Sequence, residues 1–175
     1  MIRKQLIVLL GAAAGFLVVA LVWRNAAQLF ARVALPADDT ASRLAYVAHW
    51  LILPGLTLLA GIVAAGRRGF IADAIEGTHT PASRSLEINP RYNQNTLEQT
   101  VLAAIAWGAM APILPRDALV LIAMMAFLFA FGRIAFWIGY LLHPLARAFG
   151  MVMTALPTLA AYAWLVRHAW RAQGS

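Results

Sequence analysis

The sequence predicts an all-α integral membrane protein with five membrane-crossing helices. Of its 175 residues, 62% are hydrophobic and only 12% are charged, which is too apolar for a water-soluble domain of this length. Its mostly uncharged stretches are long enough to cross about 30 Å of hydrocarbon, and they lack the alternation of a barrel strand. The five stretches are 5–23, 45–66, 96–114, 118–141 and 148–166.

The first stretch follows Arg3 and Lys4 and is longer than the hydrophobic part of a usual signal peptide. We therefore expect a retained helix. An apolar stripe at helical spacing continues beyond it, so the helix is predicted to run on to Val33 and to end near Pro36. The region 1–36 is predicted to be an additional N-terminal transmembrane helix.

The second stretch follows a polar connector in which Asp39 or Thr40 is suited to cap the next helix. Pro54 and Gly55 lie inside this second helix. A proline there removes one backbone N–H donor, so we expect a kink.

Residues 66–94 are predicted to form the substantial extramembrane loop, because they contain glycine, proline, serine and charges of both signs. The helices 96–114 and 118–141 follow as a tight antiparallel hairpin. The second of these is expected to end near Tyr140, and Pro144 separates it from the last helix.

The formal charge of +7 comes from basic residues that sit mainly at helix ends. This distribution reflects membrane topology, and we expect no nucleic-acid binding. Seven basic residues flank the face that carries the long loop and six flank the other face. The difference favours a cytoplasmic N-terminus and loop, with the C-terminus outside.

Cysteine is absent, so any thiol chemistry must use a thiol supplied by a ligand. The four histidines show no ligand spacing with one another or with a carboxylate, and no metal site is expected.

Polar residues from three helices are predicted to converge on one membrane face. Arg91, Asn95 and Glu98 share one face of a helix, because they are spaced by about one turn each. Arg133 and Tyr140, separated by about two turns, also point the same way. The complete set is Arg67, Arg68, Arg91, Asn95, Glu98, Arg133, Tyr140 and Arg147.

A carboxylate in the bilayer needs a partner, and Arg133 is placed to supply one to Glu98. The pair could be a purely structural ion pair, with Asn95 as an additional hydrogen-bonding group. The remaining arginines outnumber the nearby acids, however, and this surplus favours an anionic ligand.

The segments RYNQNTLEQT (91–100) and RIAFWIGYLLHPLAR (133–147) resemble the paired motifs of the MAPEG superfamily, the membrane-associated proteins in eicosanoid and glutathione metabolism. The resemblance covers about 45–170 and implies a four-helix bundle that assembles as a homotrimer. Glutathione would then bind between subunits near the cytoplasmic surface. The helix in 1–36 departs from that plan.

Position by position, the resemblance implies that Arg91, Asn95, Glu98 and Tyr140 hold the carboxylates and the ammonium group of glutathione. It also places Arg147 beside the thiol. Arg67 and Arg68 match an arginine pair that closes the site, and Arg133 is included among the glutathione-binding residues. Ala148 stands where the prostaglandin E synthase branch has serine, so we do not expect that isomerase activity.

The resemblance implies a glutathione transferase or peroxidase that acts on apolar electrophiles or lipid hydroperoxides from the bilayer. Arg147 and Arg68 are the predicted catalytic residues, because a guanidinium stabilises a thiolate whose unperturbed pKa is about 8.5. We expect a bacterial inner-membrane location with the site facing the cytoplasm. The alternative is a catalytically silent membrane subunit in which the same residues stabilise a trimer or bind a partner protein.

Overall fold

The computed structural model describes residues 2–71 and 84–173, and this part of the chain is helical or turn, with no strand. Two short 3-10 helices are also present: η1 (Arg67–Phe70) follows α4, and η3 (Asp117–Leu119) precedes α6. The α-helices are α1 (Ile2–Arg24), α2 (Ala26–Leu29), α3 (Thr40–Trp50), α4 (Ile52–Gly66), α5 (Arg84–Met110), α6 (Val120–Leu142) and α7 (Ala148–Gln173). The predicted all-α membrane fold is confirmed.

Four helical segments of the described chain are long and apolar enough to cross a membrane: Ile2–Arg24, Thr40–Phe70, Arg116–Leu142 and Ala148–Gln173. They correspond to four of the five predicted crossings. The fifth, 96–114, falls on α5, whose first half is polar and whose apolar half ends at Met110. α5 nevertheless packs against α4, α6 and α7 in the same bundle.

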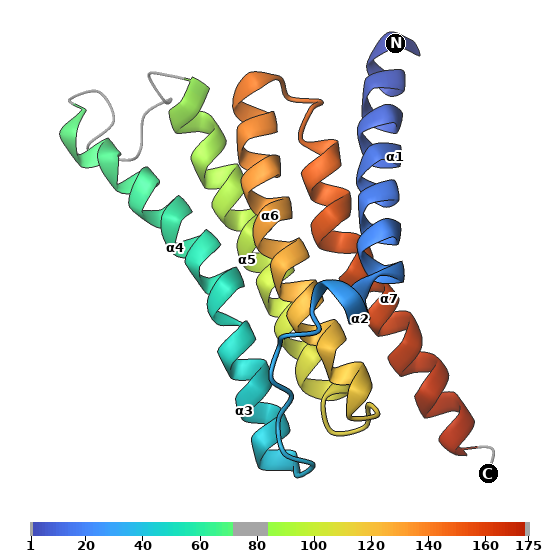
Figure 1. The fold of residues 1–175 in the computed structure, drawn as a ribbon. Helices are drawn as coiled ribbons and strands as arrows, with labels where there is room; N and C mark the ends of the chain where they lie inside the picture. Colours follow the sequence, from blue (N-terminus) through green and yellow to red (C-terminus); the bar gives the residue numbers. More distant parts are fainter. Residues whose placement is uncertain (1, 72–83, 174–175) are drawn as a thin grey trace.

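α6 lies at the centre of the bundle, between α5 and α7, while α4 and α1 lie at opposite edges (Figure 1). The N-terminus, the end of α4, the start of α5 and the α6–α7 turn share one end of the molecule. We call this the upper end. The larger apolar core lies nearer the other end and includes Trp107, Met125 and Phe129. A smaller aromatic cluster of Tyr92, Phe136 and Tyr140 lies toward the upper end.

The first helix is shorter than predicted. α1 ends at Arg24, and a separate single turn, α2, ends at Leu29, so the expected continuation to Val33 is wrong. The break lies at Asn25, whose side-chain Nδ2 donates to the Leu21 carbonyl at 2.8 Å. A short amide side chain that competes for backbone partners in this way favours a turn over a continuing helix.

Asp39 caps α3, as predicted, because its Oδ1 accepts from the backbone N–H of Ser42 at 2.8 Å. Hydrogen bonds from the side chain and backbone of Ser42 hold the pKa of Asp39 below its usual value. The predicted kink is also present. α3 ends at Trp50 and α4 begins at Ile52, so the interruption at Leu51 lies one turn before Pro54.

The predicted loop 66–94 is partly wrong, because α5 already begins at Arg84. The part of the loop at 72–83 lies outside the described residues. Pro90 sits inside α5 and has no N–H to donate to the Leu86 carbonyl one turn earlier. Arg68 Nη2 donates to that carbonyl at 3.4 Å, so the proline in α5 creates a docking point for the end of α4.

Candidate functional site

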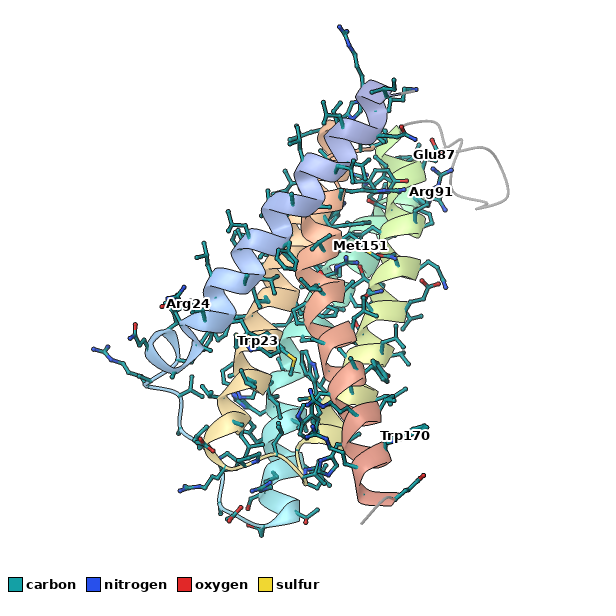
Figure 2. The ribbon with its side chains drawn as sticks, turned by 90° about the vertical axis from the view of Figure 1, so that its right-hand side faces the viewer. Trp23, Arg24, Glu87, Arg91, Met151 and Trp170 are labelled. Carbon is teal, nitrogen blue, oxygen red and sulfur yellow. The ribbon has the colours of Figure 1, made fainter. Side chains whose placement is uncertain are left out.

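Three of the predicted residues meet at the upper end of the bundle. Arg91 of α5 donates from Nη1 to the Tyr140 hydroxyl of α6 at 3.4 Å, and its Nη2 pairs with Glu87 at 2.8 Å. The Arg147 guanidinium lies 4.7 Å from the centroid of the Tyr140 ring. Figure 2 shows Glu87 and Arg91 on α5 at the end of the molecule where α1 begins. Tyr140 thus sits between two arginines from different elements.

The α6–α7 turn holds Arg147 in this position by folding back onto the end of α6. A Cβ at Gly139 would lie 2.8 Å from the Ala146 carbonyl oxygen, so a side chain there would push the turn away. Arg147 itself is exposed, while Tyr140 is buried beneath it. The arrangement presents a guanidinium to the surface on a fixed aromatic support.

Arg68 and Arg67 are placed differently from each other. Arg68 is partly buried and reaches α5 through the Leu86 carbonyl, whereas Arg67 is exposed. Arg68 therefore approaches the helix that carries Arg91, as the sequence predicted for this end of the membrane.

Arg133 lies deeper in the bundle and is completely buried. It donates to Asn95 Oδ1 at 2.7 Å, to Thr154 Oγ1 at 3.2 Å and to Met151 Sδ at 3.7 Å. Its guanidinium also lies 4.4 Å from the centroid of the Phe136 ring. All of these partners are neutral. Within the described chain the Arg133 guanidinium is therefore hydrogen-bonded, but no carboxylate neutralises its charge.

The predicted ion pair between Glu98 and Arg133 is not formed in the described chain. Glu98 is exposed and its Oε1 accepts from Gln94 Nε2 at 2.8 Å, while Asn95 takes the inward position opposite Arg133. Glu98 lies one turn further along α5 and is rotated away from α6. It belongs instead to a surface stripe of one-turn spacing, which consists of Glu87, Arg91, Gln94 and Glu98 and which we call the α5 stripe.

A second polar surface of α5 faces α4 and was not predicted. Asn89 is 1% exposed, and within the described chain neither its Nδ2 nor its Oδ1 has a hydrogen-bond partner. Asn93 Oδ1 and Thr96 Oγ1 are also buried without partners among the described residues. Asn93 packs against α4, where a Cβ on Gly61 would lie 2.1 Å from its Oδ1. Asn89, Asn93 and Thr96 are spaced by four and three residues, so they share one face of a helix. This pattern can be recognised in the sequence only once α5 is known to begin at Arg84.

The arrangement combines several fixed positive charges with neutral hydrogen-bonding groups, which suits an anionic polar ligand. Among the residues that the structure describes, no three histidine, aspartate or glutamate side chains are grouped as metal ligands.

The MAPEG family model matches residues 6–167 of this chain. Two curated relatives are both called Transmembrane protein 79. The mouse protein (Mus musculus) is 26% identical over 124 residues and the bovine protein (Bos taurus) is 27% identical over 124 residues. Each alignment covers 71% of this chain, but the chain spans only about a third of either relative, 32% and 31%. No solved structure matches.

The family match includes most of α1, so the division into an additional helix at 1–36 and a family domain at 45–170 stays a prediction. The site residues described above come from η1, α5, α6, the α6–α7 turn and α7, all inside the matched range. The chain belongs to the MAPEG family.

Proposed function

We propose that this protein is a glutathione-dependent transferase or peroxidase that acts on apolar electrophiles or lipid hydroperoxides supplied by the membrane. The observation that carries the proposal is the placement of Tyr140 between Arg91 and Arg147 at one end of the bundle. It joins a hydroxyl with two guanidinium groups, one of which is exposed at the surface.

The balance of charge at this end supports glutathione as the ligand. Among the described site residues and their polar neighbours on the α5 stripe, five are arginines (Arg67, Arg68, Arg91, Arg133 and Arg147) and two are glutamates (Glu87 and Glu98), so the arginines outnumber the glutamates by three. Glutathione in its reactive form has two carboxylates, one ammonium group and one thiolate. Its three negative groups would pair with arginines, and Glu98 would accept the ammonium group.

The proposed chemistry depends on the thiolate, which is the nucleophilic form of glutathione. Arg147 would stabilise it electrostatically and requires no proton transfer of its own. In the transferase reaction the sulfur bonds to an electrophilic carbon, and either a leaving group departs with its electron pair or, in an addition to an activated double bond, the second carbon takes a proton from water. In the peroxidase reaction the sulfur takes the distal peroxide oxygen and releases the alcohol, and a second glutathione then reduces the sulfenic acid to water and a disulfide. Arg68 would position the ligand from the end of α4.

Arg133 would act on the ligand indirectly, because its side chain is completely buried. It orients Asn95 through a 2.7 Å hydrogen bond and adds positive charge beneath the site. Asn95 is partly exposed and could contact glutathione directly.

We further propose a homotrimer with the ligand between subunits. The α5 stripe puts four polar side chains on the outside of a helix in a membrane bundle, where contact with hydrocarbon is unfavourable. A second copy of the chain that covers this stripe would remove that contact.

A catalytically silent membrane subunit is the second candidate. The name of the two relatives, Transmembrane protein 79, describes a membrane protein and states no reaction. In addition, Glu87 pairs with Arg91 and Glu98 with Gln94 inside one chain, so these groups have partners without a ligand.

Ultraviolet difference absorbance of the glutathione thiolate, measured with the detergent-purified protein, tests the proposal. We expect the wild type to lower the thiol pKa of bound glutathione, and Arg147→Ala to abolish this shift while the oligomer stays intact by light scattering. Arg171→Ala, which removes an exposed arginine at the opposite end of α7, is the matched control and should keep the shift. Loss of the oligomer in Arg147→Ala, or no thiolate in the wild type, would favour the silent subunit.

A further inference from the structure

α1 crosses α7 closely at two glycines. A Cβ at Gly15 would lie 2.7 Å from the Phe149 carbonyl oxygen, and one at Gly11 would lie 3.4 Å from the Phe149 backbone nitrogen. Small residues allow the two backbones to approach at this point. Before Gly11, the first turns of α1 run past the α6–α7 turn, and a groove of about 480 Å³ lies between them.

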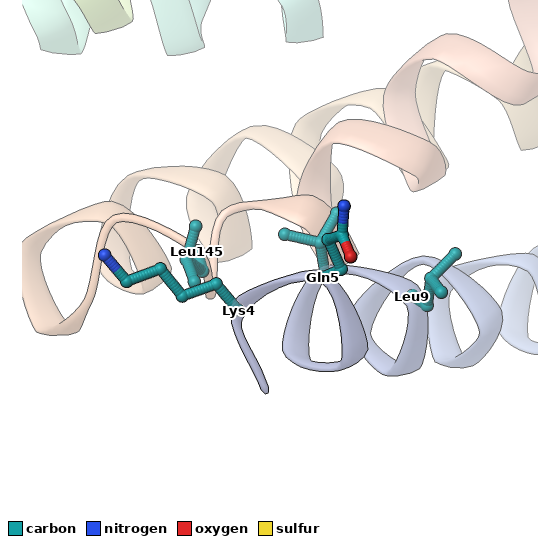
Figure 3. Close-up of a pocket in the computed structure, with 5 residues that line it drawn as sticks. Lys4, Gln5, Leu9 and Leu145 are labelled. Atoms are coloured by element: carbon teal, nitrogen blue, oxygen red, sulfur yellow. The ribbon is translucent and has the colours of Figure 1, made fainter. Parts of the chain in front are cut away.

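The groove is lined by Lys4, Gln5, Val8, Leu9 and Leu145. Figure 3 shows that the Lys4 ammonium points along the groove away from Leu9, beyond the apolar part of the lining. One end of the groove is therefore polar and cationic and the other is aliphatic. A ligand that fits this division has an anionic head and a hydrocarbon chain.

The groove lies on a helix whose exposed surface suits contact with the bilayer. α1 is a 23-residue candidate membrane span with only 11% of its most apolar window buried in the protein. The α1 residues that line the groove are exposed, so in a membrane they would contact hydrocarbon. A lipid acyl chain is the molecule present at such a surface at the highest concentration.

We propose that this groove binds one anionic phospholipid of the surrounding bilayer. Its acyl chain would lie against Val8, Leu9 and Leu145, and its phosphate would pair with Lys4 at the level of the headgroups. Lys4 stands at the start of the membrane helix, where basic side chains reach the headgroup region and attract anionic lipids. The volume falls within the roughly 300–1,000 Å³ usual for small-molecule sites.

The lipid site and the candidate catalytic site share the α6–α7 turn but lie on different sides of it. Leu145 lines the groove beside α1, whereas Arg147, two residues later, lies over Tyr140 of α6. The proposal does not depend on glutathione chemistry, since it needs only the groove and Lys4.

Native mass spectrometry of the full chain, extracted from vesicles of phosphatidylglycerol and phosphatidylcholine, tests the proposal. We expect the wild type to retain one phosphatidylglycerol per chain in preference to phosphatidylcholine. Lys4→Gln should weaken this retention about fivefold, the effect of one cationic side chain near an anionic surface. Val8→Trp, which fills the groove and keeps the charge, should also lose the lipid.

Two matched controls lie on α1 outside the groove. Arg24→Gln removes a basic residue at the other end of α1, and Leu17→Trp enlarges an exposed side chain away from the groove. Both should retain phosphatidylglycerol like the wild type. Equal retention of the two lipids by the wild type, or unchanged phosphatidylglycerol in Lys4→Gln, would overturn the proposal. Displacement of phosphatidylglycerol by equimolar oleate would also overturn it, because it would assign the groove to free fatty acids.

Discussion

Arg133 is a single residue whose position argues for function over stability. It is completely buried, and its partners Asn95, Thr154 and Met151 are neutral. Taking a charged group out of water costs free energy, and neutral hydrogen-bond partners offset only part of that cost. A buried charge that has no carboxylate partner within the described chain is therefore more easily explained by a ligand than by folding.

We predict that Arg133→Met keeps or raises the thermal unfolding midpoint in detergent and weakens glutathione binding. The binding loss follows because Asn95 loses the guanidinium that orients it and the site loses one positive charge. Thermal unfolding and calorimetric titration with glutathione measure the two effects. A lower midpoint with unchanged glutathione affinity would instead identify Arg133 as a structural residue.

Residue identities and helical spacing predicted that Arg91, Tyr140 and Arg147 would gather at one end, and the structure places them there. They could not predict which of Asn95 and Glu98 faces Arg133. The two residues are three apart and share one broad face of α5, so a rotation of less than one residue step decides between them. Packing of α5 against α6 and α7 fixes that rotation, and it turns Glu98 outward.

At the scale of the elements, Arg43 connects α3 to the end of α5. In the sequence, Arg43 is one of the six basic residues that flank the membrane face opposite the long loop, and it was expected only to mark membrane topology. In the structure it is 8% exposed, and its Nη1 donates to the carbonyl oxygens of Ala111 at 2.8 Å and Leu114 at 2.7 Å. It also donates to the Pro112 carbonyl at 3.2 Å and pairs with Asp38. These carbonyls lie in the turn that follows the end of α5 at Met110, and buried backbone carbonyls need such partners.

We predict that Arg43→Leu destabilises the fold by about 2–3 kcal/mol, since buried carbonyls at the α5–α6 turn lose a charged donor. Thermal or denaturant unfolding in detergent measures the change. Arg116→Leu is the matched control, because Arg116 is exposed and makes a single bond, from Nε to the Pro36 carbonyl at 3.1 Å. Its effect should stay within about 0.5 kcal/mol. Equal effects of the two substitutions would contradict the proposed role of Arg43.

Helix existence was easier to predict than helix limits. Long apolar stretches identified four of the crossings, and Asp39 and Pro54 located a cap and a kink. The start of α5 was missed because Pro90 and the surrounding polar residues resemble a loop in sequence. Pro90 cannot donate to the Leu86 carbonyl, and that carbonyl accepts from Arg68, a contact between distant segments that no local pattern reveals.

At the scale of the whole molecule, the α5 stripe is the feature that a single chain leaves unexplained. Glu87, Arg91, Gln94 and Glu98 lie in a row on the outer surface of a bundle in which α1 and α4 expose many large hydrophobic side chains. Val63 on α4 is 68% exposed and Leu21 on α1 is 51% exposed, as expected for side chains that face lipid. We therefore predict that the α5 stripe, and not the lipid-facing surfaces of α1 and α4, contacts another copy of the chain.

The absence of native cysteine makes this prediction simple to test, because each introduced thiol is the only one in the chain. We expect Gln94→Cys in intact membranes to give a covalent dimer with a short bismaleimide reagent, since a single cysteine per chain is cross-linked only where the α5 stripes of the subunits meet around the symmetry axis of a closed assembly. Val63→Cys and Leu21→Cys should remain monomeric on denaturing gels under the same conditions, because their side chains face lipid. Cross-linking through either lipid-facing position and not through Gln94→Cys would mean that subunits meet elsewhere. The carboxylate of Glu98 would then have to be explained by contact with water or headgroups.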